Sequence, residues 1–559
     1  MLLSLKILLI YSTVVCHLST GIFVQQGDCS TGSLVNTNGS CPPWTYHQSP
    51  NSTYCECGSS LDNVVQCKNG CVALVTCHCI SYNKELHEVV VGVCPYLCTN
   101  KYYLDVPNRV EELDSACQEI NRTGQMCGKC REKYAPSVYS YSIECTECSY
   151  YKYNWITYIL RAYLPLTIFY LVVALLRFNA MSGSLNAFIF TSQIISCPTI
   201  LSVLTTFVYY SEKNPVIPIN LKLISDLFVS FYGVWNLDFF RFVYKPFCLH
   251  PNLSSLQAIS LDYAIAVYPL LLIFLTYLFV KLYDHFQIFQ FVCKPIAWLF
   301  TKYNKNSRVG ASLIKAFGTF LLLSFVKIAN TSVNLLMPVQ IYNMSGHVIG
   351  LYTYYNGSLP YFGHNHLPYA LLAIFMFAIF NLIPLLLLCL YPCRCFQSCL
   401  NRYKLNSQVL CIFMDAFQGY FKFEPDYRYF SGFYPFLRIA LFLIFGVTGT
   451  KYFIMISGIV AIPTTVFVVI LRPYKNNITN IIDIVFLLNF VLFTFAASSI
   501  PLTSLELKYL PFSYVMFGVT LTFPVIYGIV LAVFSILPMS AIAIKSCIAN
   551  YVLQVNRDT

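Results

Sequence analysis

Charged side chains are scarce in this 559-residue sequence. Asp, Glu, Lys and Arg together make up only 11% of it, whereas 57% of the residues are hydrophobic. A water-soluble globule of this size needs far more charged surface, so a soluble fold is excluded. The mean hydropathy of +0.61 is that of a chain lying largely in a lipid bilayer.

Catalytic and metal-binding motifs are also lacking. The sequence has no HExxH, no GxSxG and no phosphate-binding glycine loop, so we do not expect an enzyme or a cofactor. His364 and His366 would supply only two metal ligands, which makes a poor site. Basic residues form no contiguous tract, so nucleic acid is not an expected partner.

Cysteine, by contrast, is concentrated in one region. Residues 1–21 have the layout of a secretory signal peptide, and residues 22–153 contain fifteen of the 25 cysteines. We predict a disulfide-rich extracellular domain over 22–153, a multi-pass transmembrane domain over 154–537 and a cytosolic tail over 538–559. The expected fold class is an all-α polytopic membrane bundle of about nine transmembrane helices, preceded by a small disulfide-rich extracellular domain.

Four cysteines in the extracellular domain have a paired spacing. Cys127 and Cys130 precede Cys145 and Cys148 in a pattern close to that of a zinc ribbon. The oxidising secretory route favours disulfides over zinc, although spacing does not define the pairing. The odd total leaves one cysteine as a free thiol or as a bridge to a second copy, which would make a homo-oligomer.

Glycosylation sequons mark the expected outer surface. The candidates are Asn38, Asn51, Asn121, Asn252, Asn343 and Asn356.

Nine apolar stretches are long enough to cross about 30 Å of hydrocarbon. They are 156–176, 185–210, 258–280, 312–336, 369–390, 432–449, 452–471, 481–500 and 512–537. A tenth stretch, 219–245, contains five charged residues and is interpreted as an amphipathic or re-entrant segment.

Charge distribution supports nine spans in preference to ten. With the N-terminus extracellular and the C-terminus cytosolic, inner segments contain fifteen Lys or Arg and outer segments contain six, as the positive-inside rule requires. A span at 219–245 would reverse this distribution after about residue 282. We expect a plasma-membrane protein in this orientation, with the lipid bilayer as one partner.

Lys327 is the most unusual residue within a predicted span. It lies fifteen residues past Ser312, about 22 Å along the helix, too deep to reach water easily. Polar residues at helical spacing accompany it and form an intramembrane polar stripe of Ser324, Lys327, Asn330, Thr331 and Asn334.

The stripe has two interpretations. It lines a permeation path or ligand pocket, or it is a buried polar cluster that holds the bundle together. Candidate partners on other spans are Asn186, Gln193, Asn381 and Asn489. Other charged residues lie nearer the span ends, where we expect them to reach toward water or cap a helix; they include Arg161, Asp262, Arg438 and Asp483.

A predicted inner loop begins with three cysteines. Cys393, Cys395 and Cys399 follow a span directly and lie near basic residues, which makes them palmitoylation candidates or else reduced thiols.

Two stretches resemble known membrane proteins. The first comprises the 127–130 and 145–148 cysteine pairs with Asn154, Trp155 and Pro165, and the second comprises residues 426–434, Arg438, residues 472–475 and Asn480. Over about residues 125–500 the chain resembles largely uncharacterised multi-pass surface proteins of invertebrates and protists with a cysteine-rich stalk. It is more distantly similar to fungal TRP-like membrane proteins, which implies a polytopic and channel-like protein. The sequence lacks a TVGYG filter.

Two functions compete. One is a TRP-like channel or transporter whose cysteine-rich ectodomain senses a ligand, with an extracellular ligand or ions as further partners. The alternative is a non-conducting surface receptor or adhesion protein anchored by the bundle.

Overall fold

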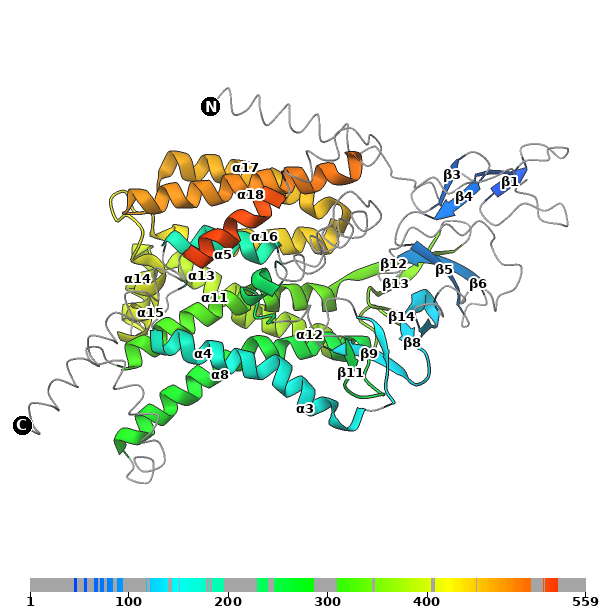
Figure 1. The fold of residues 1–559 in the computed structure, drawn as a ribbon, viewed down its shortest axis with the longest axis horizontal. Helices are drawn as coiled ribbons and strands as arrows, with labels where there is room; N and C mark the ends of the chain where they lie inside the picture. Colours follow the sequence, from blue (N-terminus) through cyan, green and yellow to red (C-terminus); the bar gives the residue numbers. More distant parts are fainter. Residues whose placement is uncertain are drawn as a thin grey trace, which may run out of the picture. The chain divides into compact units, whose positions relative to one another are not determined.

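The computed structural model describes a little over half of the chain. The described residues are 45–47, 55–57, 65–68, 71–74, 78–83, 88–93, 117, 121–138, 143–149, 151–176, 180, 183–195, 228, 230–239, 246–285, 309–343, 347–403, 408–448, 450–503, 516 and 518–530. They form two compact units. The first combines residues 1–181, 236–419 and 423–449, and the second combines 182–235, 420–422 and 450–559. Figure 1 shows the ribbon.

The strands all belong to the first unit. They are β1 (Thr45–His47), β2 (Cys55–Cys57), β3 (Val65–Lys68), β4 (Cys71–Leu74), β5 (His78–Asn83), β6 (Glu88–Val93), β7 (Arg122–Thr123), β8 (Lys129–Cys130), β9 (Tyr134–Val138), β10 (Cys145–Glu147), β11 (Phe247–Cys248), β12 (Pro338–Asn343), β13 (Val348–Thr353) and β14 (Asn356–Pro360). The largest sheet has the order β14-β13-β12-β6-β5 and is antiparallel throughout. It unites the cysteine-rich domain with a segment that lies between two predicted spans.

The junction in this sheet is the pair β6–β12. Val91 lies opposite Tyr342, and Val90 lies opposite Asn343. Below the sheet, Val90 and Ile341 share a small core with Met126 and the Cys117–Cys127 disulfide. Sequence patterns did not predict this sheet, because its two halves are about 250 residues apart in the chain.

A close approach between two segments explains why residue 357 is a glycine. A Cβ atom at Gly357 would lie 2.6 Å from the Cβ of Met126, a separation that real Cβ atoms do not adopt. The 3₁₀ turn η3 (Gln125–Cys127) therefore packs directly on β14 only because residue 357 has no side chain.

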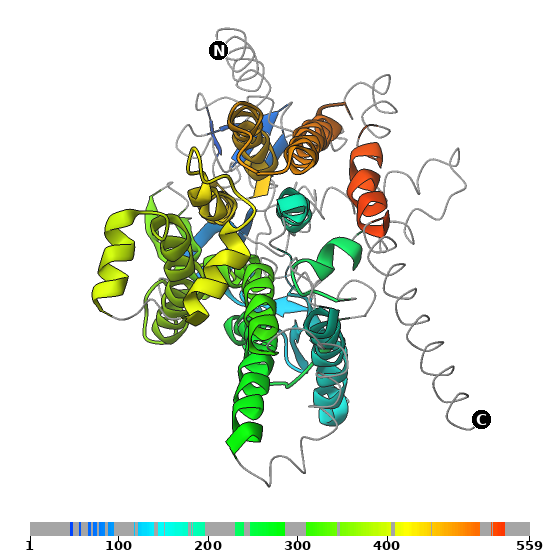
Figure 2. The ribbon, with the colours of Figure 1, turned by 90° about the vertical axis from the view of Figure 1, so that its left-hand side faces the viewer.

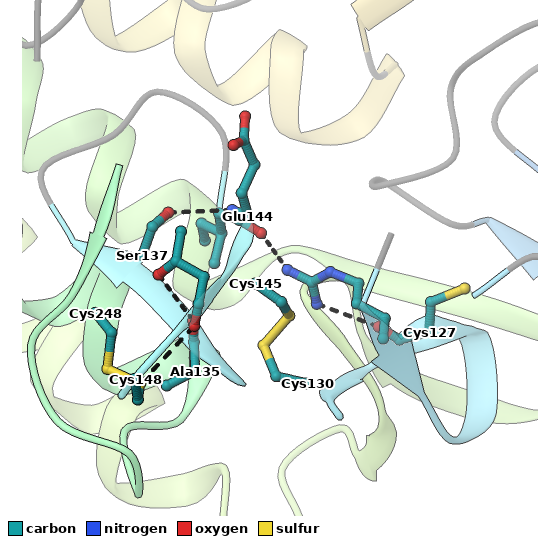
Figure 3. The surroundings of a disulfide bond; sticks show 11 residues. Cys127, Cys130, Ala135, Ser137, Glu144, Cys145, Cys148 and Cys248 are labelled. Carbon is teal, nitrogen blue, oxygen red and sulfur yellow. Dashed lines mark hydrogen bonds between the residues drawn. A yellow bond between two sulfur atoms is a disulfide. The ribbon is translucent and has the colours of Figure 1, made fainter. Parts of the chain in front are cut away.

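A second sheet joins the end of the cysteine-rich domain to another distant segment. Its order is β10-β9-β11, and Phe247 lies opposite Val138. The Cys148–Cys248 disulfide crosses the same junction (Figure 3). The third described disulfide, Cys130–Cys145, links β8 to β10.

The first unit contains α11 (Val309–Leu336) and several further helices. They are η4 (Tyr151–Tyr153), the continuous run α3 (Asn154–Tyr158), η5 (Ile159–Tyr163) and α4 (Leu164–Leu176), then α8 (Ser255–His285), the continuous run α12 (Leu367–Phe377), η6 (Ala378–Leu382) and α13 (Ile383–Leu390), and finally α14 (Arg394–Arg402), α15 (Gln408–Gln418), η7 (Arg428–Gly432) and α16 (Phe433–Thr448). Figure 2 shows the cyan α4 beside the green α8, where Thr167 and Tyr268 hydroxyls lie 2.8 Å apart.

Local sequence explains where α8 begins. Ser254 Oγ accepts a hydrogen bond from the Gln257 N–H, and Gln257 Oε1 accepts one from the Ser254 N–H. This reciprocal capping box satisfies two amide groups that the first turn leaves unpaired. Both π-helical turns, η5 and η6, end two residues before a proline, Pro165 and Pro384 respectively. A proline lacks the N–H needed to continue regular helical bonding, so the turn widens there.

The second unit contains α5 (Gly183–Ile195), α17 (Thr450–Leu471), α18 (Asn477–Thr503) and a helix over Gly518–Val530. Figure 1 shows α17 beside α18. Aromatic rings fill the interior, with Phe188 against Trp235, Phe486 and Tyr527 at centroid separations of 4.9 to 5.8 Å.

Five helices of the described residues are long and apolar enough to cross a membrane. They span Asn154–Ala174, Ser255–Val280, Ser312–Leu336, Leu367–Leu390 and Asn477–Ala497, and they coincide with five of the nine predicted spans. The chain is therefore a mostly helical membrane protein with a disulfide-linked N-terminal region. Of the predicted spans 185–210 and 512–537, the described parts are only 185–195, 516 and 518–530.

The tenth, ambiguous segment is not one continuous helix. Helical structure ends at Val234, a turn follows at residues 235–237, and Leu237 has a φ of 60°. Residues 219–227 and 240–245 lie outside the described part. A turn in the middle of the segment is compatible with a re-entrant path and not with a straight amphipathic helix over its full length.

Candidate functional site: a buried charge cluster on α11

Helix α11 is the most buried of the five membrane-length helices. In its most apolar window 83% of the residues are buried, against 28% for the first helix, 33% for α8 and 28% for α12–α13. Helices α8, α12, α15 and α16 all contact α11. A polar side chain on α11 must therefore find its partner inside the protein.

Lys327 forms a charge cluster with two carboxylates from different segments. Its Nζ donates to Asp238 Oδ1 and lies 3.6 Å from Oδ1 of Asp262. Asp238 follows the turn at residues 235–237, and Asp262 lies on α8. The Lys327 side chain is only 4% exposed. Such a charge is tolerated in this position only because it is paired, since an isolated ion in a nonpolar interior is very unfavourable.

Two other stripe residues also bind partners. Ser324 Oγ donates to the Ala266 carbonyl of α8 at 2.7 Å, and Asn334 Oδ1 accepts from the Tyr355 hydroxyl at 3.5 Å. Beside the stripe, the Ser332 hydroxyl lies 2.7 Å from that of Tyr263. The α8–α11 interface is thus held by polar contacts along several turns.

The remaining stripe residues differ in their surroundings. Thr331 is buried. Asn330 Oδ1 is buried and has no hydrogen-bond partner among the described residues. A buried amide oxygen without a donor loses about 1–3 kcal/mol of hydration, so Asn330 is the least satisfied member of the stripe.

Lys327 contacts carboxylates and none of the four amides that were candidate partners of the polar stripe. Asn381 is buried in η6 but donates through Nδ2 to the Phe325 carbonyl of α11 at 2.8 Å. Gln193 and Asn489 donate to the carbonyls of Trp235 and Thr520 within the second unit. Asn186, also on α5, is buried there. The true partners are carboxylates, whose full charge compensates an ammonium group better than an amide dipole does.

The expectation that charged residues near span ends reach toward water also fails in part. Asp262 contacts Lys327. Arg438 and Asp483 are almost completely buried. Arg161 lies over the Phe247 ring, with its guanidinium carbon 5.2 Å from the ring centroid. The side chains of Arg438 and Asp483 are therefore packed inside the protein and do not reach toward water.

The segment between α11 and α12 fixes the C-terminal end of α11. Tyr361 donates from its hydroxyl to the Leu336 carbonyl at 2.6 Å. His366 Nε2 lies 2.9 Å from the Leu335 carbonyl, while its Nδ1 accepts from the Phe362 N–H. Because Nδ1 is an acceptor, Nε2 carries the proton and donates. These contacts satisfy carbonyls that every helix leaves unpaired at its C-terminus.

Burial has a further effect on Tyr361. It raises the pKa of the phenol above its ordinary value, which keeps the hydroxyl protonated as a donor.

One residue after α11 ends, the chain enters β12. Strand β12 pairs with β6 of the cysteine-rich domain, so that domain is connected through β12 to the helix that carries Lys327. The second junction, Cys148–Cys248, lies seven residues before α8, which carries Asp262. Both helices of the charge cluster are therefore attached to the disulfide-linked domain.

All four predicted disulfide cysteines are bonded, but in an unforeseen pattern. Cys127 pairs with Cys117, and Cys130 pairs with Cys145. Cys148 pairs with Cys248, which lies outside the cysteine-rich domain. Because Cys148 pairs outside the domain, the odd number of cysteines in residues 22–153 does not by itself require a free thiol or a second copy.

The predicted modification sites have contrasting environments. Asn252 is exposed, and Asn121 is half-buried. Asn356 is buried, and its Oδ1 accepts from the Ser358 N–H, so the folded structure argues against a glycan there. Asn38 and Asn51 lie outside the described residues, as does the side chain of Asn343. Three further candidates, the palmitoylation cysteines Cys393, Cys395 and Cys399, are exposed thiols, and their modification stays a prediction.

Within the described part of the chain, no group of three His, Cys, Asp or Glu side chains could hold a metal ion. The sequence matches no family model and no curated protein, and the fold matches no solved structure.

Proposed function

We propose that this protein is a cell-surface channel or transporter whose permeation path is controlled by the Lys327 charge cluster. The observation that carries the proposal is the ion pair between Lys327 and Asp238, buried within the most enclosed membrane-length helix. Ionisable residues at membrane depth are expensive and therefore mark ion or substrate paths by default. The resemblance to channel-like surface proteins agrees with this function.

In the closed state the charge cluster holds α11, α8 and Asp238 together. Breaking it separates charges that water must then solvate, so an open state is a hydrated one. A ligand on the cysteine-rich domain shifts strand β6, and the β6–β12 pair transmits that shift to α11. Ligand binding changes the open fraction only by its differential affinity for the two positions of the domain.

Electrical recording from cells that express the chain tests this function. We expect a current that Lys327→Leu changes by at least about tenfold, equivalent to about 1.4 kcal/mol in the gating equilibrium. Lys315→Leu, on the same helix, is the matched control and leaves the current unchanged. Surface labelling confirms equal delivery of both variants. Absence of current under all conditions, with normal delivery, contradicts channel function, and transporter function is then tested by flux into proteoliposomes.

A nine-span topology accompanies this proposal. The Cys148–Cys248 disulfide and the β9–β11 pair require residues 148 and 248 to lie on the same side of the membrane. Spans 156–176 and 185–210 already make two crossings between them. A further crossing at 219–245 would make the number odd and put the two residues on opposite sides, which favours the nine-span arrangement.

Glycosylation mapping tests the topology. A sequon inserted after Pro246 acquires a glycan, because that position is extracellular in the nine-span arrangement. A sequon inserted after Phe300 does not, because it is cytosolic. The opposite pattern contradicts the combination of nine spans with an extracellular N-terminus.

A receptor without conduction is the second candidate. The observation in its favour is that the cysteine-rich domain is bonded to two separate segments of the bundle, through β6–β12 and through Cys148–Cys248. A passive anchor would not need this attachment. A ligand-dependent change in Lys327 accessibility without any current would favour the receptor.

A further inference from the structure

A second candidate site lies apart from the Lys327 cluster, beside the start of the first long helix. It is an open pocket of about 730 Å³, within the range of small-molecule sites, which is about 300–1,000 Å³. Its lining residues are Lys152, Trp155, Tyr158, Ile159, Tyr163, Leu249 and His250.

The pocket is preformed because its two walls are cross-linked. One wall is the run η4–α3–η5, and the other is the pair Leu249–His250 that follows β11. The Cys148–Cys248 disulfide joins the residues that precede the two walls, as Figure 3 shows. Asn154 Nδ2 also donates to the Cys248 carbonyl at 2.5 Å. A site held in this way loses little conformational entropy when a ligand binds.

The polar groups of the pocket suit an anion. Lys152 contributes a positive charge at an exposed position. His250 Nδ1 accepts from the Asn252 N–H at 3.2 Å, so in the neutral ring the proton is on Nε2, which is a donor. The lining contains no carboxylate. Two donors without an opposing negative charge form the kind of environment that binds phosphate oxygens.

The rest of the lining is aromatic or aliphatic and continues onto an exposed apolar surface. Trp155 and Ile159 are exposed on the helix Asn154–Ala174, of whose apolar window only 28% is buried. Ile156 and Leu160 extend this exposed apolar face along the same helix. A water-soluble anion does not need such a surface, whereas a lipid does. Aromatic residues beside a cationic residue at the start of a span are also typical of the headgroup level.

We propose that this pocket binds a glycerophospholipid from the surrounding bilayer. The phosphate lies between Lys152 and His250, and the glycerol and upper acyl chains pack against Trp155 and Ile159. The site is independent of the proposed conduction path, so a test of one proposal does not decide the other.

Native mass spectrometry of the full-length protein in detergent, titrated with defined compounds, tests the proposal. Phosphatidylglycerol is expected to bind at least about tenfold more tightly than diacylglycerol, which lacks the phosphate, and than glycerol 3-phosphate, which lacks the acyl chains. Equal binding of diacylglycerol overturns the proposal, because it indicates an apolar groove without phosphate recognition. Equal binding of glycerol 3-phosphate also overturns it, because it indicates a site for a soluble anion.

Variants locate the site. The double substitution Lys152→Ala with His250→Ala is expected to weaken phosphatidylglycerol binding at least about tenfold. Lys129→Ala removes the same charge from an exposed strand of the same domain and is expected to leave binding unchanged. Unaltered binding by the double variant overturns the assignment to this pocket. The comparison of the three compounds on the unmodified protein does not depend on whether the variants fold.

Discussion

Helices α11 and α12–α13 are both of membrane length, yet they occupy opposite environments. The window of α11 has a mean hydropathy of 1.7 and is 83% buried, whereas that of α12–α13 has a mean hydropathy of 2.7 and is 28% buried. The more apolar helix is thus the more exposed one. In water this order would be reversed.

The difference shows that the usual rule, by which the more apolar segments are the more buried ones, does not hold for these helices in a bilayer. Lipid tails solvate apolar side chains as well as a protein interior does, so hydrophobicity alone does not draw a helix inward. Polar side chains find no partner in lipid, and they therefore draw α11 to the centre of the first unit. The polar stripe with Lys327 is the cause of this central position.

The largest expected effect comes from breaking the buried charge pair. Lys327→Met leaves Asp238 without its ammonium partner, and an uncompensated buried charge costs about 3–5 kcal/mol of unfolding free energy. Lys315→Met, on the half-buried part of the same helix, should cost less than about 1 kcal/mol. Thermal or denaturant unfolding in lipid nanodiscs gives both values. Equal losses in the two variants would remove the distinction between the middle and the end of α11.

The second-largest difference in stability between the two helices is expected for substitutions that remove part of an isoleucine side chain. Ile328 on α11 is fully buried, and Ile374 on α12 is 49% exposed. Ile328→Ala should cost about 2–4 kcal/mol because the cavity stays empty, whereas Ile374→Ala should cost less than about 0.5 kcal/mol because lipid fills the space. The same unfolding measurement compares them. A larger loss at Ile374 would indicate that α12 faces another protein surface.

A smaller effect is expected for the hydrogen bond that joins the two helices. Asn381→Ala removes the bond to the Phe325 carbonyl and should cost about 0.6 kcal/mol, the average for bonds between membrane helices, and at most about 1.7 kcal/mol. Asn401→Ala, at an exposed position of α14, is the matched control and should change stability by less than about 0.5 kcal/mol. A negligible loss at Asn381 would show that apolar packing alone positions α12 on α11.

The smallest effect is expected for an exposed counterpart of the buried pair. Arg428 donates to Asp426 through Nε at 2.9 Å and holds the pKa of that carboxyl below its ordinary value. Because the folded-state pKa is lowered, the stabilisation exists at neutral pH and is lost as the pH falls through the acidic range. Asp426→Asn should therefore cost at most about 0.5 kcal/mol at neutral pH, and the cost should shrink as the pH falls and vanish once the pH is below the lowered pKa of Asp426. A loss as large as that of Lys327→Met would erase the contrast between buried and exposed pairs.

Long apolar runs made five membrane helices predictable from sequence. The span predicted at 312–336 corresponds to α11, Val309–Leu336. Lys327 could also be singled out, because a charge in the middle of such a run needs an explanation. The order of apolar and charged residues along one segment is sufficient to predict the helices and to single out Lys327.

Pairings between distant segments were not predictable. Lys327 and Asp238 are 89 residues apart, and Cys148 and Cys248 are 100 apart. Strand β12 follows a span and has no obvious partner in its own neighbourhood, because its partner β6 lies in the cysteine-rich domain. Each of these contacts depends on how helices pack, and periodicity records only which face of a helix is apolar.

A double-mutant cycle between Lys327 and Asp238 tests the central claim most directly. Unfolding free energies of Lys327→Met, Asp238→Leu and the double variant in lipid nanodiscs give the interaction energy of the pair. The buried charge cluster predicts a coupling of at least about 2 kcal/mol, with the double variant more stable than the sum of the two single losses implies. Additive losses, with a coupling below about 0.5 kcal/mol, would contradict the pairing and with it the account of why α11 lies at the centre.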